Sequence, residues 1–176
     1  LVGSEMCIRD SLWRVHKEVP AKGQIAIFNR SHYEDIIAVR VKKIFPDPVW
    51  KRRYKHVLDF ESMLAEEGTV IIKLFLNISK EEQKKRLESR LQDPDKLWKF
   101  CMDDLDDRNR WDEFQTAYQD LIEKTSTPEA PWYIIPADRK WYRNLVVARL
   151  MVEKLRHLQL SLPTPNFDPA SIIIPD

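Results

Sequence analysis

Three short apolar runs, separated by longer amphipathic segments, set the strongest limit on how this chain can fold. The runs cover residues 24–29 (QIAIFN), 69–78 (TVIIKLFLNI) and 132–136 (WYIIP), and each is rich in β-branched or aromatic residues. Nearly continuous apolar runs of this length are typical of strands in a parallel sheet that is covered on both faces. The sequence therefore predicts a sheet in which these three strands run parallel.

Segments with helical periodicity lie between and after these runs. A helix that joins one parallel strand to the next is the usual crossover of an α/β protein. The expected helices cover residues 32–45, 51–67, 79–92, 103–125 and 139–158. Ser79 and Glu82 have the spacing of a capping box at the start of one of them. The predicted fold class is α/β, with helices on both faces of a parallel sheet.

The bulk composition excludes several classes of protein. The chain has 176 residues, of which 43% are hydrophobic and 32% charged, which suits one soluble domain. A net charge of +1 gives no general attraction to nucleic acid, and no apolar run reaches the roughly 18 residues of a membrane span. Cys7 and Cys101 lack metal-ligand spacing and are too few for a disulfide framework, which favours the cytoplasm. We therefore expect neither nucleic acid nor membrane as a partner.

Both ends of the chain depart from the alternating pattern. Residues 1–11 (LVGSEMCIRDS) show no periodicity, and the string VGSEMCIRDS resembles a translated sequencing adapter. We interpret residues 1–11 as an artefact, residues 12–160 as the domain and residues 161–176 as an extended, proline-rich arm. The charged stretch 93–110 is the predicted lid, and we expect it to be the least rigid internal segment.

The polar run after the first predicted strand is the strongest local sign of a binding site. It reads FNRSHYED over residues 28–35, where a strand is expected to end and a helix to begin. Ligands of open α/β sheets bind at that edge. A capping box explains Ser31 and Glu34, but it does not explain Arg30, because a cation is unfavourable at a helix N-terminus. A phosphate group held by Arg30 and the helix N–H groups resolves that conflict.

A row of cations with one aromatic residue follows the second predicted strand. Its members are Arg86, Arg90, Lys96, Trp98 and Lys99. Arg86 and Arg90 share a helix face, and Trp98 lies between two lysines. Such a row is either a solvated surface or a contact for a polyanion, and the spacing leaves both interpretations open.

A second polar run follows the third predicted strand at residues 137–144 (ADRKWYRN). Asp138 suits the N-cap of the last helix. Lys140 and Arg143 are either a further phosphate contact or surface charge, and we interpret this run as mainly structural.

Together, three of these motifs resemble the polyphosphate kinase 2 family. They are FNRSHYED at 28–35, DPDKLWK at 93–99 and APWYIIPADRKWYRN at 130–144, and the resemblance covers residues 12–160. It implies a P-loop kinase fold related to thymidylate kinase. It also implies phosphoryl transfer between inorganic polyphosphate and nucleotides, with Mg²⁺, in a cytoplasmic homo-oligomer.

The resemblance also implies roles for single residues. Arg30 and Lys99 are the implied catalytic residues, with Arg30 binding phosphate near the transfer site. The implied substrate-binding residues are Asn29, Ser31, Glu34, Arg86, Arg90, Lys96 and Trp98. Glu34 replaces an Asn of other members, which resembles the subgroups that act on AMP as well as ADP. The metal ligands stay unassigned.

The sequence departs from the family in one respect: it contains no counterpart of the Gly-rich Walker A loop. Phosphoryl transfer depends on the positioning and charge neutralisation that this loop supplies. We therefore expect the intact parent to be an enzyme and this fragment to be inactive alone. The alternatives are an ATP-dependent nucleoside monophosphate kinase and a non-catalytic, anion-binding partner subunit. The preferred nucleotide and the direction of transfer stay open.

Overall fold

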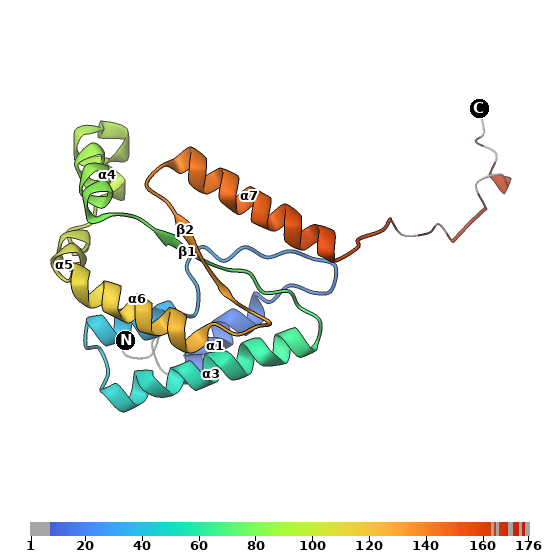
Figure 1. Cartoon of the computed structure of the whole chain (residues 1–176), viewed down its shortest axis with the longest axis horizontal. Helices are drawn as coiled ribbons and strands as arrows, with labels where there is room; N and C mark the ends of the chain where they lie inside the picture. Colours follow the sequence, from blue (N-terminus) through green and yellow to red (C-terminus); the bar gives the residue numbers. More distant parts are fainter. Residues whose placement is uncertain (1–7, 163, 165, 169–170, 173, 175–176) are drawn as a thin grey trace.

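The structure, a computed structural model, describes residues 8–162, 164, 166–168, 171–172 and 174. Two parallel strands, β1 (Lys73–Asn77) and β2 (Trp132–Pro136), form the sheet of this part of the chain (Figure 1). The helices, in chain order, are α1 (Ile8–Lys17), α2 (Glu34–Val41), α3 (Asp47–Glu66), α4 (Lys80–Gln92), the 3₁₀ helix η1 (Pro94–Lys99), α5 (Asp103–Asn109), α6 (Trp111–Thr125) and α7 (Lys140–His157). The predicted parallel arrangement of the second and third apolar runs is confirmed, but the second strand covers residues 73–77 instead of the predicted 69–78, because only these residues face β2.

Helices flank both faces of the sheet. Phe75 is aligned with Ile134, so Phe75 and Tyr133 point to opposite faces, because successive side chains of a strand alternate. The Phe75 ring lies 4.8 Å from that of Tyr118 in α6, whereas Lys154 of α7 lies 5.5 Å from the Tyr133 ring. The strands accordingly run between α6 and α7 in Figure 1, as the predicted α/β class requires.

The main hydrophobic core lies where α2 packs against α3 and α6. Ile36, Ile37 and Val39 of α2 are at most 1% exposed, and they meet Val57 of α3 and Leu121 of α6. A helix that is buried on nearly all sides must be apolar on nearly all sides, which explains the composition of α2. This helix begins at Glu34 and ends at Val41, inside the predicted 32–45. Its C-terminal end is set by Lys43, whose φ of 53° is left-handed.

Residues 24–29 do not form the predicted first strand, so that prediction is wrong. Ile25 and Ile27 are 68% and 83% exposed, and the described chain offers this segment no strand partner. A strand needs a neighbour that satisfies its backbone N–H and C=O groups. Without one, an apolar β-branched run remains an irregular connection between α1 and α2.

The predicted helix over 103–125 is broken in two. Arg110 separates α5 from α6, and its backbone N–H bonds to Asp107 in a tight turn. Its guanidinium Nη1 donates to the Val41 carbonyl at 3.0 Å, which ties this break to the end of α2. The predicted lid at 93–110 therefore contains η1 and α5, and its mobility stays a prediction.

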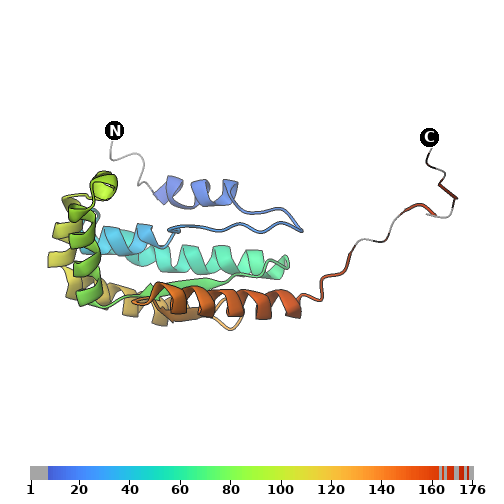
Figure 2. The same cartoon turned by 90° about the horizontal axis from the view of Figure 1, so that it is seen from above.

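The two ends of the chain differ in what the structure describes. Residues 1–7 of the predicted artefact lie outside the described residues, whereas residues 8–11 begin α1. The artefact interpretation therefore stays a prediction. After α7, the described part of the C-terminal arm extends away from the rest of the chain (Figure 2). Among the described helices, none has the length and apolar character needed to span a bilayer.

The predicted cap at Ser79 is confirmed and gives a test of the fold. Its Oγ accepts the backbone N–H of Glu82 at 3.1 Å, but the Glu82 side chain pairs with Arg86 instead of closing a capping box. Ser79→Ala should lower the free energy of unfolding by about 1 kcal/mol, because one N–H of the first turn loses its partner. Urea unfolding followed by circular dichroism measures this. Ser89→Ala, on the exposed side of the same helix, is the control, and an equal loss there would contradict the cap.

Candidate functional site

The carboxyl ends of β1 and β2 lie at the same edge of the sheet, because the strands are parallel and in register. Here α4 begins shortly after β1, and α7 shortly after β2. An open cavity of about 410 Å³ lies at this edge. Its wall includes Asn77, Ser79, Asp138, Arg139 and Tyr142. This is the edge at which ligands of open α/β sheets bind.

Arg86 holds the two connections at this edge together. Its Nη2 donates to the carbonyls of Ala137 at 2.7 Å and Asp138 at 3.2 Å, and its Nε donates to Glu82 at 2.8 Å. The Asp138 carboxylate accepts the backbone N–H of Ser79 at 2.8 Å. Asp138 therefore anchors the loop before α4, and its predicted role as N-cap of α7 is wrong.

The loop that carries Arg30 is a tight turn before α2. Arg30 has a φ of 66°, a left-handed conformation that costs a non-glycine residue roughly 1–3 kcal/mol. The predicted capping box of Ser31 and Glu34 is wrong, because α2 has no side-chain cap. Instead, the Glu34 N–H bonds to the Ser31 carbonyl, and the next N–H groups bond likewise. These N–H groups are occupied, so an anion at this loop depends mainly on Arg30, which is exposed.

A charged cluster forms around Glu34 at the start of α2. Burial raises the pKa of Glu34, and the positive charge of Arg30 partly offsets that rise, while Asp107 of α5 adds to it. Burial also raises the pKa of Tyr118 in α6 to about 12, and the negative charge of Glu34 adds to this shift. Residues from the Arg30 loop, α2, α5 and α6 therefore act on one another electrostatically. Asp107 is further paired with Lys42 at 2.9 Å.

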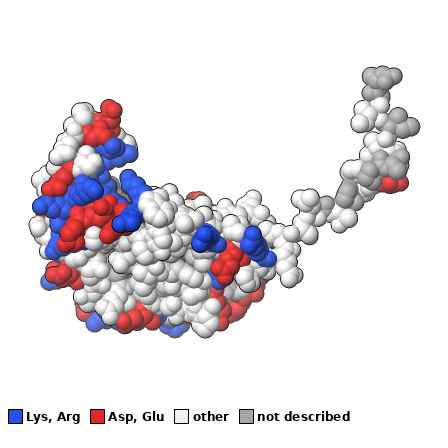
Figure 3. Space-filling view, turned by 45° about the horizontal axis from the view of Figure 1, so that its top comes forward, with Lys and Arg blue, Asp and Glu red and all other residues white. Residues whose placement is uncertain are grey.

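The cations of the predicted anion-binding row have protein partners. Arg90 lies 3.3 Å from Asp104 in α5, and Lys96 is paired with Asp93. Figure 3 shows Lys and Arg gathered over the lobe of α4 and the lid, with acidic side chains among them. Exposed pairs of this kind are weak and screened by salt, so a phosphate group can replace the carboxylate.

Trp98 is the most exposed large hydrophobic residue of this lobe. Its side chain is 78% exposed, and the Nζ of Lys99 lies 5.0 Å from its ring. The indole N–H donates to the Asp95 carbonyl at 3.0 Å, which orients the ring. An aromatic face next to a cation suits a contact with a base or a phosphate chain.

A buried polar network behind the Arg30 loop was missed by sequence reasoning. The side chains of Glu61 in α3 and Lys73 in β1 are each 4% exposed and lie 2.7 Å apart. Glu61 Oε1 also lies 2.5 Å from the Tyr33 hydroxyl and 3.2 Å from His32 Nε2. Two signals were available in the sequence. Glu61 follows the buried Val57 by one helical turn, and Lys73 interrupts an apolar strand.

The family model described as Polyphosphate kinase 2 (PPK2) matches residues 5–162. This chain belongs to the polyphosphate kinase 2 family. It is 54% identical over 166 residues to the AMP/ADP-polyphosphate phosphotransferase of Meiothermus ruber, and the match covers 94% of this chain and 62% of that protein. It is 37% identical over 166 residues to the ADP-polyphosphate phosphotransferase of Rhodopseudomonas palustris. That match covers 88% of this chain and 57% of that protein.

Solved structures of polyphosphate kinase 2 share the fold. The crystal structure of Polyphosphate Kinase 2 from Arthrobacter aurescens TC1 is 48% identical with a TM-score of 0.88, covering 92% of this chain and 57% of that one. A structure from Pseudomonas aeruginosa is 31% identical with a TM-score of 0.81. The predicted P-loop kinase-like fold class is confirmed. The chain spans about 57 to 62% of the length of the first three of these relatives.

In this polyphosphate kinase 2 chain, the predicted site residues fall into three groups. Asn29, Arg30, Ser31 and Glu34 lie in the loop before α2 and at its first residue, Arg86 and Arg90 lie on α4, and Lys96, Trp98 and Lys99 lie on η1. The structure brings Arg30 and Glu34 together and uses Arg86 to hold the backbone after β2. The roles of these residues in binding and catalysis stay predictions.

The Glu34 cluster predicts opposite effects for two substitutions. Arg30→Ala should raise the pKa of Glu34, because the cation that favours its ionised form is lost. Asp107→Asn should lower that pKa, because a neighbouring negative charge is lost. A ¹³C NMR titration of the Glu34 carboxyl carbon measures both shifts. Asp59→Asn, which changes an exposed ion pair on α3, should leave the titration unchanged, and shifts of equal sign in the two cluster variants would contradict the arrangement.

Proposed function

We propose that this chain is part of an enzyme that transfers phosphoryl groups between inorganic polyphosphate and nucleotides, with AMP and ADP as acceptors. The strongest support is its 54% identity to the Meiothermus ruber AMP/ADP-polyphosphate phosphotransferase. Glu34 in the FNRSHYED motif agrees with AMP as an acceptor besides ADP. The proposal concerns the whole protein, because this chain spans 62% of that relative.

The geometry supports different roles for two groups of cations, one at the transferred phosphoryl group and one along the polyphosphate chain. Arg30 is exposed on a strained turn beside the half-buried Glu34, where its guanidinium can hold the phosphoryl group that is transferred. Arg90, Lys96 and Lys99 lie farther along the chain in α4 and the lid, next to the exposed Trp98. A long polyanion exchanges the carboxylate partners of Arg90 and Lys96 for phosphate oxygens and adds a contact to Lys99. Several contacts are needed, because each exposed one is weak.

The family resemblance implies Mg²⁺, which carboxylate side chains could help to bind. The described residues contain no group of three His, Cys, Asp or Glu side chains that could hold a metal ion. Mg²⁺ in kinases is held largely by substrate phosphates, water and one or two carboxylates. A site of that kind needs fewer than three protein ligands, so Mg²⁺ stays a prediction.

Polyphosphate is favoured over ATP as the donor by the names of the relatives. The proteins from Meiothermus ruber, Rhodopseudomonas palustris and Pseudomonas syringae are all named for polyphosphate. A homo-oligomeric state and a cytoplasmic location complete the proposal. The exposed free thiol of Cys101 agrees with a reducing compartment.

The test is a chimera that joins this chain to the part of the Meiothermus ruber protein outside the match. We expect the folded chimera to form ADP and ATP from AMP and polyphosphate, and this chain alone to form neither, because the Walker A loop is missing. Turnover with ATP instead of polyphosphate would favour a nucleoside monophosphate kinase. A folded chimera that is inactive with both donors would refute the proposal.

The role of Arg30 predicts a loss of turnover. In the chimera, Arg30→Ala should lower kcat by about 100-fold or more, as expected when a contact to developing charge is removed. Steady-state kinetics with AMP measures this. Arg52→Ala, which removes an exposed guanidinium from α3, is the matched control. Near-normal turnover of the Arg30 variant would show that the assignment is wrong.

The two lysines of η1, Lys96 and Lys99, predict an effect that differs between the two substrates. Lys96→Ala combined with Lys99→Ala should raise the apparent KM for long polyphosphate much more than the KM for AMP. It should also flatten the salt dependence of polyphosphate binding, because fewer screened contacts remain. Lys51→Ala with Lys55→Ala on α3 is the control of equal charge. Equal effects on the two substrates would mean that the lid lysines are surface charge.

A further inference from the structure

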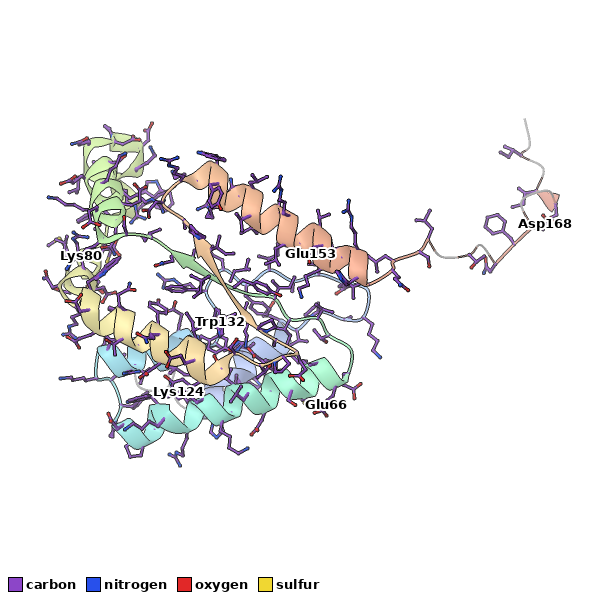
Figure 4. All side chains as sticks on the ribbon, viewed as in Figure 1. Glu66, Lys80, Lys124, Trp132, Glu153 and Asp168 are labelled. Carbon is purple, nitrogen blue, oxygen red and sulfur yellow. The ribbon has the colours of Figure 1, made fainter. Side chains whose placement is uncertain are left out.

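The buried network around Glu61 joins five parts of the fold. Lys73 Nζ donates to Glu61 Oε2 at 2.7 Å and to the Thr125 carbonyl at 2.6 Å, which links β1, α3 and the end of α6. The Trp132 indole donates to Thr125 Oγ1 at 2.8 Å and so adds the start of β2, where Figure 4 labels Trp132. The fifth part is the Arg30 loop, through Tyr33.

The division of contacts between the two oxygens of Glu61 is the central observation. Oε2 receives Lys73, whereas Oε1 lies 2.5 Å from the Tyr33 hydroxyl and 3.2 Å from His32 Nε2. One oxygen therefore belongs to the ion pair, and the other holds two consecutive residues of the loop. His32 and Tyr33 are the second and third residues after Arg30.

Stability alone does not explain a buried ion pair at this place. Moving a carboxylate and an ammonium out of water is unfavourable, and well-packed apolar side chains of similar volume are often equally stabilising. Burial acts to raise the pKa of Glu61, but hydrogen bonds from His32, Lys73 and Tyr33 outweigh burial and hold that pKa below its ordinary value. The carboxylate therefore stays ionised and accepts hydrogen bonds at both oxygens.

The Arg30 turn needs such an anchor. Arg30 has a left-handed backbone, and the helix that follows has no side-chain cap. A conformation that is unfavourable on its own persists only when surrounding contacts determine it. The Tyr33 side chain supplies these contacts, because it is buried and its ring lies 4.9 Å from that of Trp132.

We propose that Glu61 is a positioning residue, which fixes the Arg30 turn through Tyr33 and His32, while Lys73 holds the Glu61 carboxylate in place. The effect of this positioning on catalysis rests on the proposed function, in which Arg30 holds the transferred phosphoryl group. The holding of the turn itself does not depend on that function.

The test uses two double variants that both lack the ion pair. In Glu61→Gln with Lys73→Met, an amide oxygen remains to accept from Tyr33 and His32. In Glu61→Leu with Lys73→Met, no acceptor remains. The two variants therefore have the same change in charge and differ in the hydrogen bonds to the loop.

Hydrogen exchange of the turn is the first readout. The amides of Glu34, Asp35 and Ile36 bond to carbonyls of the turn, so their exchange rates report its opening. We expect these amides to exchange about tenfold or more faster in the Leu variant than in the Gln variant. Equal exchange in the two folded variants would overturn the proposal. If the Leu variant fails to fold, Tyr33→Phe, which keeps the ion pair, serves instead and is compared with the unchanged chain.

Kinetics of the chimera are the second readout. The Leu variant should have a kcat about tenfold or more lower than the Gln variant, at a similar KM for AMP, because a displaced Arg30 weakens the transition state more than the ground state. A merely structural role would lower the amount of folded enzyme, but it would leave kcat per folded molecule and the KM for AMP unchanged. Equal kcat values would also overturn the proposal. An unmodified chimera without activity would refute the proposed function, while the exchange experiment would still decide whether Glu61 holds the turn.

Discussion

The rest of the structure depends on the ion pair that Lys73 and Glu61 form in the interior. Lys73 is the first residue of β1 and is aligned with Trp132 at the start of β2. Its ammonium group binds α3 through Glu61 and α6 through the Thr125 carbonyl. Removing one partner would leave an uncompensated charge in the interior, which costs about 3–5 kcal/mol. The amino ends of both strands are therefore fixed to the helical core, and the strands carry that placement to the opposite edge, where the candidate site lies.

The cations of the predicted anion-binding row are not equivalent in the structure. Arg86 binds two backbone carbonyls after β2 and a carboxylate on its own helix, so it holds the frame of the site. Arg90 is paired with the Asp104 carboxylate on α5, and Lys96 is paired with the Asp93 carboxylate before η1. A carboxylate partner resembles a phosphate group in charge and geometry, whereas a pair of carbonyls does not. The row thus combines a structural arginine with cations that are suited to exchange their partners.

Sequence patterns predicted the parts of the fold that depend on local chemistry. The parallel strands at 73–77, within the predicted 69–78, and at 132–136 follow from apolar runs, and the cap at Ser79 follows from one local hydrogen bond. The strand at 24–29 failed because a strand also requires a neighbour, which its own sequence does not reveal. The charged residues Glu61 and Lys73 were missed because formal charge argues for exposure, and only the tertiary structure brings their partners together. For the candidate site, the role of the Arg30 loop stays a prediction, and the strand expected before it is absent from the described residues. The anchoring of this loop in the core was not predictable, because it depends on residues far away in the sequence.

The parallel pairing of β1 with β2 has a consequence for synthesis of the protein. The helices α4, η1, α5 and α6 all lie between the two strands in the sequence. On the ribosome, β1 leaves the exit tunnel well before β2 has been made, so its ladder of hydrogen bonds has to wait for most of the chain. During that interval Lys73 and the apolar side chains beside it lack their cover from β2, and the ammonium group can already be held by Glu61, which precedes it. The carboxylate that neutralises Lys73 is thus made before the strand that buries it, so the charge has a partner by the time β2 arrives.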